Sequence, residues 1–387
     1  MSIVLTAAST ATAVDRPVRV MVVDDSIVAR RLLTRWIGAE PDMMVAGCSC
    51  TGREAVERIE ECNPDVVVLD VDMPELDGIS ALPLLLKKKR DLVVIMASTL
   101  TRRSAEISLR ALSLGAADYV PKPEAAGNAA AAESFHRELI DKIRSLGRRG
   151  MFARQAKPAA VPRQPLPELG RRAGAFPPAE APAPFSLRPF ATSAPRVLLI
   201  GSSTGGPQAL TTLIGQIGAT IERAPILITQ HMPPTFTTVL AEHLARASGR
   251  RVHEAEHDEA VVAGGVYVAP GGRHMRVVRG REGPLIALGD DPPINYCRPS
   301  VDPLLSSAAR VWGSGSLALV LTGMGSDGSR GAAEIVAAGG SVIAQDEATS
   351  VVWGMPRSVA QAGLCSAVLP LWQIAATVNR LFAGERT

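Results

Sequence analysis

The chain has little of what would commit it to a membrane, a disulfide framework or a nucleic acid. No run of about 18 apolar residues occurs in it, so no membrane insertion is expected. Its five cysteines are scattered, odd in number and form no CxxC pair, which disfavours a metal or disulfide role and favours a reduced, cytoplasmic protein. The net charge of +3 is too small to predict a nucleic-acid surface.

The amino terminus also lacks the pattern of an export signal. Residues 1–16 are small and polar, and no basic segment leads into an apolar core, so they predict a disordered tail. What the chain does have is a hydrophobic content of 47%, which allows a sizeable packed core. Its 387 residues are enough for about two or three domains.

Apolar strand-like runs alternate with helical patterns between residues 17 and 146. Strands are predicted at Val18–Val23, Met43–Ala46, Asp65–Leu69, Leu92–Ala97 and Asp118–Val120. Helices are predicted at Ile27–Ile37, Thr51–Glu61, Gly78–Lys89 (broken or kinked near Pro83), Arg103–Leu114 and Glu133–Leu146. This alternation predicts a doubly wound parallel sheet, in which chemistry gathers at the carboxyl ends of the strands.

Polar residues of matching types follow several of these strands. Asp24, Asp25 and Asp70 each lie at a strand end, and three close carboxylates need a cation, for which Mg²⁺ is well suited. Ser98 and Lys122 also follow strands and would reach the same crevice, where they suit a phosphoryl group. The alternative is that each acid only caps a helix or is solvated, which fits one residue better than five.

This half resembles the receiver domain of two-component response regulators, over residues 17–146. The matching segments are VVDDS (Val22–Ser26), LDVDMPELDG (Leu69–Gly78) and YVPKP (Tyr119–Pro123). The resemblance implies that Asp70 accepts a phosphoryl group, and that Mg²⁺ is held by Asp24, Asp25, Asp70 and the backbone carbonyl of Asp72. It also implies that Ser98 and Tyr119 form a switch pair and that Lys122 pairs with the anion.

Composition changes between residues 147 and 193, which are rich in Pro, Ala and Arg. Dense prolines block helices and sheet ladders, so this segment predicts an extended, semi-rigid linker. Its basic start could serve as a nucleic-acid arm, but a solvated linker fits the low overall charge better.

A second α/β domain is predicted over residues 194–384, again as a doubly wound parallel sheet, of the Rossmann-like three-layer type. Buried strands are expected at Val197–Ile200, Pro225–Gln230, Ala318–Thr322 and Ser341–Ala344, with shorter ones at Val252–Ala255 and Val266–Ala269. After the turn Pro270–Gly272, the segment His274–Val278 is expected to return as a hairpin. A helix is expected at Ala332–Ala338.

The segment Gly201–Gly205 fits the pattern G-x-S-x-G, which exposes a nucleophilic serine on a sharp strand-to-helix turn. Ser203 is the serine, and Pro207 suits the start of the following helix. By the motif alone, a phosphate-cradling loop or a plain tight turn remains open.

His231 and Asp327 also lie just past buried strands, so they can converge with Ser203 as base and orienting acid. His274 is the rival base and Asp346 the rival acid. Backbone N–H groups near Thr204 or Met324 are candidates for an oxyanion hole.

The second half resembles the catalytic domain of the chemotaxis protein-glutamate methylesterase family, and the order of receiver, linker and esterase matches that family end to end. The motifs are Ile200–Pro207, Ile228–Pro234, Tyr267–Met275, Arg298–Leu305, Leu321–Gly328 and Ala344–Pro356. The resemblance implies the triad Ser203, His231 and Asp327, with no cofactor for the esterase. Ser202 stands where Ala is usual and Asp72 where Glu is common, and the tail and linker are long.

The family further implies hydrolysis of glutamate methyl esters on chemoreceptors, deamidation of some receptor glutamines, and phosphorylation by a chemotaxis histidine kinase. A monomer is expected. One alternative is a response regulator whose second half only binds a partner protein. Another is a transcription regulator, which no helix-turn-helix pattern or basic stripe supports.

Overall fold

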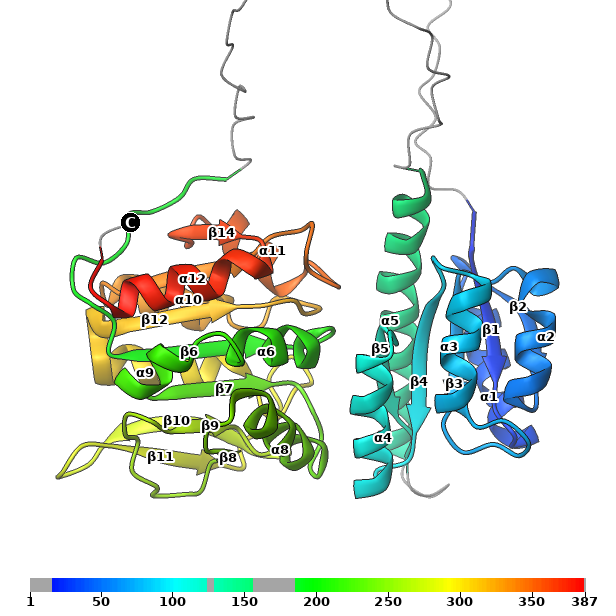
Figure 1. Ribbon diagram of the computed structural model, residues 1–387, viewed down its shortest axis with the longest axis horizontal. Coiled ribbons are helices and arrows are strands. Elements are labelled where there is room, and N and C mark those ends of the chain that lie inside the picture. Colours follow the sequence, from blue (N-terminus) through cyan, green and yellow to red (C-terminus); the bar gives the residue numbers. More distant parts are fainter. Residues whose placement is uncertain (1–15, 124–128, 156–184, 386–387) are drawn as a thin grey trace, which may run out of the picture.

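The computed structural model describes residues 16–123, 129–155 and 185–385. It contains two domains, each built around a parallel sheet, which lie side by side (Figure 1). The predicted tail and the central part of the predicted linker fall outside the described residues. In the part of the chain that is described, no helix combines the length and the apolar character needed to span a membrane.

The first domain has a five-stranded parallel sheet in the order β2-β1-β3-β4-β5. Its strands are β1 (Val18–Val23), β2 (Met43–Ser49), β3 (Val66–Asp70), β4 (Val93–Ser98) and β5 (Asp118–Pro121). The helices are α1 (Ile27–Ala39), α2 (Gly52–Cys62), α3 (Gly78–Lys88), α4 (Arg102–Ser113) and α5 (Ala129–Gln155). The chain order reverses between β1 and β3, so their carboxyl ends, with Asp24 and Asp70, border one crevice.

Short polar side chains set where these helices begin. The side chains of Ser26, Thr51, Asp77 and Thr101 each accept a hydrogen bond from a backbone N–H in the first turn of the helix that follows. Helix α3 is continuous through Pro83 and not broken there, because buried Leu82 and Leu85 hold both sides of the proline against the core.

Helix α5 differs most from expectation, because it continues past Leu146 to Gln155. Residues 147–155, predicted as linker, are therefore helical. At Gly147 the helix passes close to the sheet: a Cβ there would lie 2.5 Å from Val18 Cγ1, so a residue without a side chain fits this position. β2 also runs beyond the predicted Ala46, because Cys48 and Ser49 still pair with β1.

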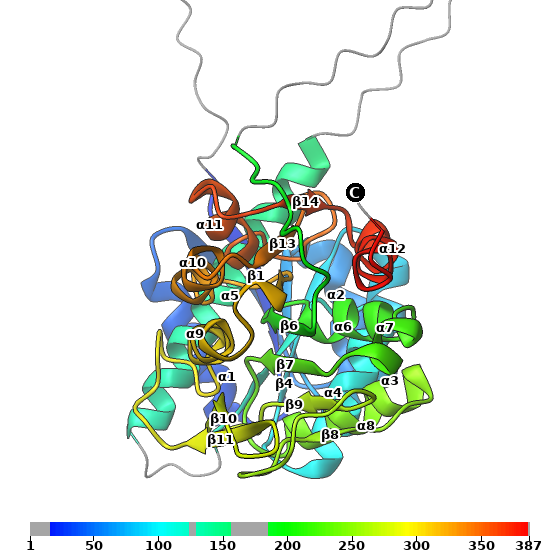
Figure 2. The ribbon, with the colours of Figure 1, turned by 90° about the vertical axis from the view of Figure 1, so that its left-hand side faces the viewer.

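The second domain has a seven-stranded parallel sheet in the order β14-β13-β12-β6-β7-β9-β8. Its strands are β6 (Val197–Ser202), β7 (Ile226–Gln230), β8 (Val252–Glu254), β9 (Val266–Val268), β12 (Ser316–Val320), β13 (Ser341–Gln345) and β14 (Ala367–Leu369). The helices are α6 (Gly206–Ile214), α7 (Gly218–Arg223), α8 (Phe236–Ser248), α9 (Val301–Trp312), α10 (Ser329–Ala337), α11 (Met355–Gln361) and α12 (Leu371–Phe382). Helices cover both faces (Figure 2), which confirms the predicted fold class of two doubly wound parallel-sheet domains, here a three-layer α/β arrangement.

The expected hairpin return onto the preceding strand is wrong. β10 (His274–Arg279) pairs antiparallel with β11 (Pro284–Gly289) and not with β9. The reason is packing against α9: Val277 N–H donates to Ser307 Oγ at 3.0 Å, and buried Met275 and Val277 join the core beneath that helix.

The second domain also begins earlier than residue 194. Arg188 N–H donates to Cys365 O and Ala191 N–H donates to Ser341 Oγ, both at 2.8 Å. The end of the predicted linker is therefore part of this domain's surface.

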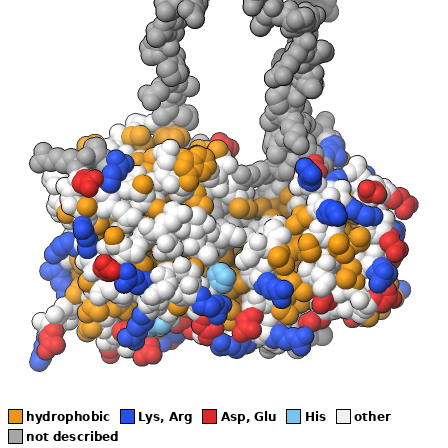
Figure 3. Space-filling model, viewed as in Figure 1, with side chains coloured by type: hydrophobic (Ala, Val, Ile, Leu, Met, Phe, Trp, Pro, Cys, Tyr) orange, Lys and Arg blue, Asp and Glu red, His pale blue; other side chains and the backbone are white. Residues whose placement is uncertain are grey.

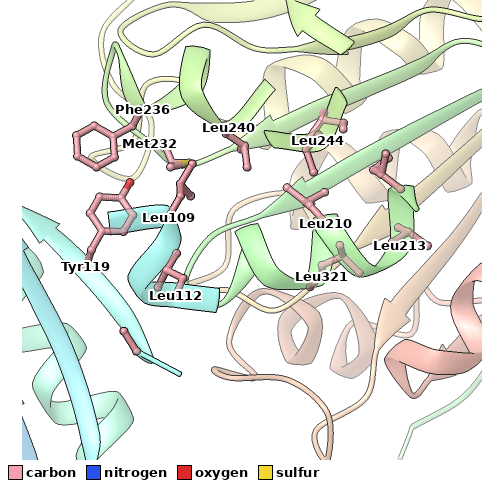
Figure 4. Close-up of a cluster of buried hydrophobic side chains, with 14 of the residues drawn as sticks. Leu109, Leu112, Tyr119, Leu210, Leu213, Met232, Phe236, Leu240, Leu244 and Leu321 are labelled. Atoms are coloured by element: carbon pink, nitrogen blue, oxygen red, sulfur yellow. The ribbon is translucent and has the colours of Figure 1, made fainter. Parts of the chain in front are cut away.

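The two domains meet through an apolar contact. Its side chains are part of one buried hydrophobic cluster that contains core residues of both domains. Leu109 and Leu112 of α4 and Tyr119 of β5 face Met232 and Phe236 (Figure 4). At the edge of this contact, Arg102 Nη2 donates to both carboxylate oxygens of Glu242, at 2.7 and 2.8 Å. Figure 3 shows acidic and basic side chains interspersed over both domains on the face in view.

Candidate active site

Ser203 lies in the turn between β6 and α6, as the motif predicts. Gly205 adopts a φ of 75°, which favours glycine. A Cβ on Gly206 would lie 1.9 Å from Gln230 Oε1, so only glycine lets the helix begin this close to the neighbouring strand. The turn therefore projects Ser203 from the carboxyl edge of the sheet.

Gln230, which the sequence reasoning did not single out, fixes this turn. Its Oε1 accepts from Ser202 Oγ at 2.7 Å, and its Nε2 donates to Ser203 O at 2.9 Å. The Ser203 N–H donates to Thr322 O at 3.0 Å. The serine at position 202 thus has a structural partner. The sequence feature that could have identified Gln230 is its position, because it ends β7 immediately before His231.

His231 and Asp327 are brought together from two strand ends. His231 Nε2 lies 2.7 Å from Asp327 Oδ2. Asp327 is 2% exposed and also accepts from Ser300 Oγ at 2.8 Å and from the N–H groups of Val301 and Gly328 at 2.7 and 2.8 Å. Burial alone would raise the pKa of Asp327, but the hydrogen bond and charge of His231 lower it to about 2. Asp327 is therefore an ionised partner that fixes the imidazole.

The second nitrogen of the ring faces a residue that the sequence reasoning did not place in the site. His231 Nδ1 lies 3.4 Å from Cys297 Sγ, and no hydrogen bond among the described residues joins His231 to Ser203 Oγ. Burial lowers the pKa of His231, but the Cys297 sulfur and Asp327 more than offset this and raise it to about 10. Only tertiary structure places Cys297 here, because its surrounding sequence is an ordinary loop.

Neither rival residue is available for chemistry. His274 is buried, with Nδ1 accepting from Ser300 N–H at 3.2 Å and Nε2 donating to Pro292 O at 3.1 Å. Asp346 accepts from Thr349 N–H and Oγ1 at 2.9 and 2.6 Å, so it orders the turn after β13.

The two residues predicted for the oxyanion hole, Thr204 and Met324, each have a backbone N–H group that is free to donate. In the described part of the chain, the N–H groups of Thr204 and Met324 donate to no backbone carbonyl. Thr204 itself is held by Thr322 Oγ1, which donates to Thr204 O at 2.8 Å. Both residues border the same cavity as Ser203 and His231.

That cavity has a volume of about 660 Å³ and lies between the two domains. From the second domain it is lined by Ser203, His231, Cys297 and Met324, among others. From the first domain the lining includes Tyr119, Arg137 and Lys142. The first domain therefore covers the Ser203 turn without filling the space in front of it.

A second cluster lies at the strand ends of the first domain. Ligand oxygens of Asp24, Asp25 and Asp70 all lie within 4.8 Å of one another. Lys122 Nζ lies 2.7 Å from Asp24 Oδ2 and 2.7 Å from Asp70 Oδ1. Burial raises the pKa of Asp70 to about 6, and the Asp24 charge adds to this while Lys122 opposes it. Three converging carboxylates beside one lysine fit a hard divalent cation such as Mg²⁺.

The predicted switch residues are Ser98, at the end of β4, and Tyr119, in β5. Ser98 is buried and its Oγ lies 2.9 Å from Ser108 Oγ. Tyr119 is also buried, and its ring stacks on Phe236 of the second domain with centroids 4.8 Å apart. The side chain of Asp72 is exposed, and its carboxylate is not part of the cluster that Asp24, Asp25 and Asp70 form. The switch tyrosine is thus part of the domain contact.

Comparisons with known proteins agree with the families predicted for the two halves of the chain. Residues 198–378 match the family model of the CheB methylesterase, and residues 20–132 match that of the response regulator receiver domain. The Thermotoga maritima CheB methylesterase catalytic domain is 41% identical over 49% of this chain and 100% of its own, with a TM-score of 0.47.

Full-length relatives are more similar. A protein-glutamate methylesterase/protein-glutamine glutaminase of group 2 operon from Bradyrhizobium diazoefficiens is 61% identical over 96% of both chains. One of the same description from Rhodopseudomonas palustris is 62% identical, also over 96% of both. With its receiver-type first domain and its esterase-type second domain, the chain belongs to the protein-glutamate methylesterase/protein-glutamine glutaminase family.

Proposed function

We propose that this protein is a phosphorylation-gated serine hydrolase of chemotaxis-type signalling, which demethylates glutamate methyl esters on chemoreceptors and deamidates specific receptor glutamines. The observation that carries the chemistry is the buried His231–Asp327 pair, which borders one cavity with the Ser203 turn. The family membership supplies the substrate class.

Each residue has a defined task in this reaction. Ser203 Oγ attacks the ester carbonyl while His231 takes its proton, and Asp327 stabilises the imidazolium that forms. The N–H groups of Thr204 and Met324 stabilise the tetrahedral oxyanion. His231 then returns the proton to the methoxy group, and methanol leaves. A water molecule, deprotonated by His231, hydrolyses the acyl-serine to free glutamate. A glutamine follows the same route with ammonia as the leaving group.

The receiver domain supplies the gate. A chemotaxis histidine kinase donates the phosphoryl group to Asp70. Asp24, Asp25, Asp70 and the backbone carbonyl of Asp72 would hold Mg²⁺, which would supply neutralisation of charge during phosphoryl transfer. Lys122 pairs with the phosphoryl oxygens, and Ser98 and Tyr119 rearrange. Because Tyr119 stacks on Phe236, rearrangement of this tyrosine weakens the domain contact that covers the cavity.

A non-catalytic output domain is the alternative. This alternative does not explain the buried Asp327, which accepts several hydrogen bonds and holds His231 near the Ser203 turn. A domain that only bound a partner protein would not need such a pair.

The first prediction tests the catalytic assignment by methanol release from methylated chemoreceptor membranes. Ser203→Ala should reduce the rate by several orders of magnitude, and His231→Ala by a similar factor, because triad members act as a unit. Ser134→Ala removes another serine that borders the cavity, from the receiver side, and should leave the rate unchanged. Full activity of Ser203→Ala would contradict the proposal.

A further inference from the structure

One short turn contacts both the catalytic histidine and the receiver. Ile294 and Cys297 exchange backbone hydrogen bonds of 3.1 and 2.9 Å around Asn295 and Tyr296. Both central residues have positive φ, 50° and 64°, as in a tight type I′ turn. A tyrosine rarely adopts this conformation, so the surroundings must hold it there.

The receiver contacts the outer side of the turn through the Tyr296 ring. Tyr296 is 78% exposed, and the Arg137 guanidinium of α5 lies 4.0 Å from its ring centroid. A guanidinium over an aromatic face is an attractive contact. On the inner side, Cys297 Sγ lies 3.4 Å from His231 Nδ1. The receiver is therefore two contacts away from the catalytic base.

The contact on the inner side matters because an imidazole has only two nitrogens. His231 Nε2 is committed to Asp327, so Nδ1 is the nitrogen that must accept the Ser203 proton. In the docked arrangement of the domains, Cys297 takes that position and Ser203 does not.

We propose that Cys297 is a positioning residue that holds His231 Nδ1 away from Ser203 while Arg137 of the receiver clamps Tyr296. Docking of the receiver then disables the base in addition to covering the cleft. When the receiver leaves, the Ile294–Cys297 turn loses its clamp and Nδ1 becomes free to engage Ser203. This inference rests on the proposed function and adds a second layer to its regulation.

Electrostatics point in the same direction. Burial lowers the pKa of His231, whereas the Cys297 sulfur and Asp327 raise it, so the contact at Nδ1 favours the protonated ring over the free base. The other charged groups that border the cavity are Asp118, Arg137, Glu138, Asp141, Lys142, Arg298 and Asp327. Of these, Asp327 is the one hydrogen-bonded to the ring among the described residues, and it remains in place when Cys297 is replaced.

The test uses the unphosphorylated full-length protein and a small ester, 4-nitrophenyl acetate, which fits a cavity of about 660 Å³ without the receiver leaving. The measurement is kcat/KM against pH, which reports the base of the free enzyme. Cys297→Ala should move the acid limb to lower pH by about one pH unit or more and raise the rate at neutral pH about tenfold.

Cys297→Ser removes the sulfur but keeps a hydroxyl that can still bond Nδ1. It should therefore shift the acid limb in the same direction as Cys297→Ala, with a smaller gain in rate. Cys50→Ala, which removes an exposed cysteine of the other domain, should change nothing. An unchanged pH profile in both Cys297 variants, each folded by calorimetry, overturns the inference. Hydrolysis that does not depend on Ser203 would instead overturn the proposed function.

Two arginine variants test the clamp. Arg137→Ala and Arg102→Ala each remove one contact between the domains, but only Arg137 touches the turn. Arg137→Ala should reproduce the shift of the acid limb seen with Cys297→Ala, and Arg102→Ala should not. Equal shifts would mean that general undocking acts on His231, and the clamp through Tyr296 would be rejected.

Discussion

At the scale of single residues, two buried aspartates with opposite pKa shifts serve the two halves of the proposed mechanism. Burial raises the pKa of Asp70 to about 6, whereas burial of Asp327 is outweighed by hydrogen bonds and the His231 charge, and its pKa falls to about 2. The difference lies in the number of donors that each carboxylate faces.

Asp70 should be the single phosphorylated residue. With Mg²⁺ and acetyl phosphate, the wild-type chain is expected to form a hydroxylamine-labile acyl phosphate, and Asp70→Asn should form none, because an amide cannot attack the phosphoryl group. Glu75→Gln, an exposed change nearby, serves as the control and should label normally. Label retained by Asp70→Asn, for instance on Ser98, would contradict the assignment; intact-mass spectrometry provides the readout.

Asp327 should stabilise the fold as well as orient His231. A carboxyl with a depressed pKa contributes stability above its unfolded pKa and loses it as the pH falls through the folded one. Asp327→Asn is therefore expected to cost about 2 kcal/mol at neutral pH, and this cost should shrink as the pH is lowered from 5 toward 2. The free energy of unfolding of both chains, measured with urea at several pH values, gives this cost.

Asp346→Asn is the matched control for this experiment. Asp346 accepts hydrogen bonds within a local turn and is only half-buried, and an amide oxygen can still accept them. Its cost at neutral pH should therefore be smaller than that of Asp327→Asn. A cost for Asp327→Asn that does not vary with pH would show that its charge is not what stabilises the domain.

At the scale of elements, helix α4 of the receiver packs its apolar face on the second domain, and we expect this contact to hold the receiver over the cleft. Leu109 is 4% exposed and faces Met232 (Figure 4). Leu109→Asp should separate the domains by placing a charge in this contact, and the unphosphorylated chain should then hydrolyse receptor esters as fast as the phosphorylated wild type.

Leu114→Asp, a change of the same kind at an exposed residue that caps α4, should leave the low basal rate unaltered. Phosphorylation of the Leu109→Asp chain at Asp70 verifies that its receiver is folded. If that chain is folded but no faster, the α4 contact does not restrain the enzyme.

At the scale of the whole molecule, the receiver is tethered to the domain it covers, so even weak docking is populated through a high effective concentration. A fragment starting at residue 185 should therefore release methanol faster than the unphosphorylated full chain, and phosphorylation should bring the full chain up to the fragment. The fragment must include residues 185–193, because Arg188 and Ala191 bond to the second domain. Equal rates for fragment and unphosphorylated chain would leave the receiver a role in delivery only.

The sequence by itself was sufficient for the fold class and for most of the candidate residues. Buried strands are short apolar runs, and parallel sheets gather residues at their carboxyl ends, so Asp24, Asp70, Ser203, His231 and Asp327 could all be placed by counting along the chain. Each residue is located by a local sequence pattern, together with the rule that the carboxyl ends of parallel strands lie at one edge of the sheet. Neither step depends on how side chains pack.

Only the tertiary structure decided which atoms meet across distant segments. The contact of Cys297 with His231, the support of Ser203 by Gln230, and the partner strand of β10 depend on packing between elements far apart in sequence. The close approach of Gly147 in α5 to Val18 depends on packing in the same way. No local pattern encodes such contacts, because each is fixed by the shape of two surfaces at once. This is also why the proposed link from the receiver to His231 is visible only in the folded chain.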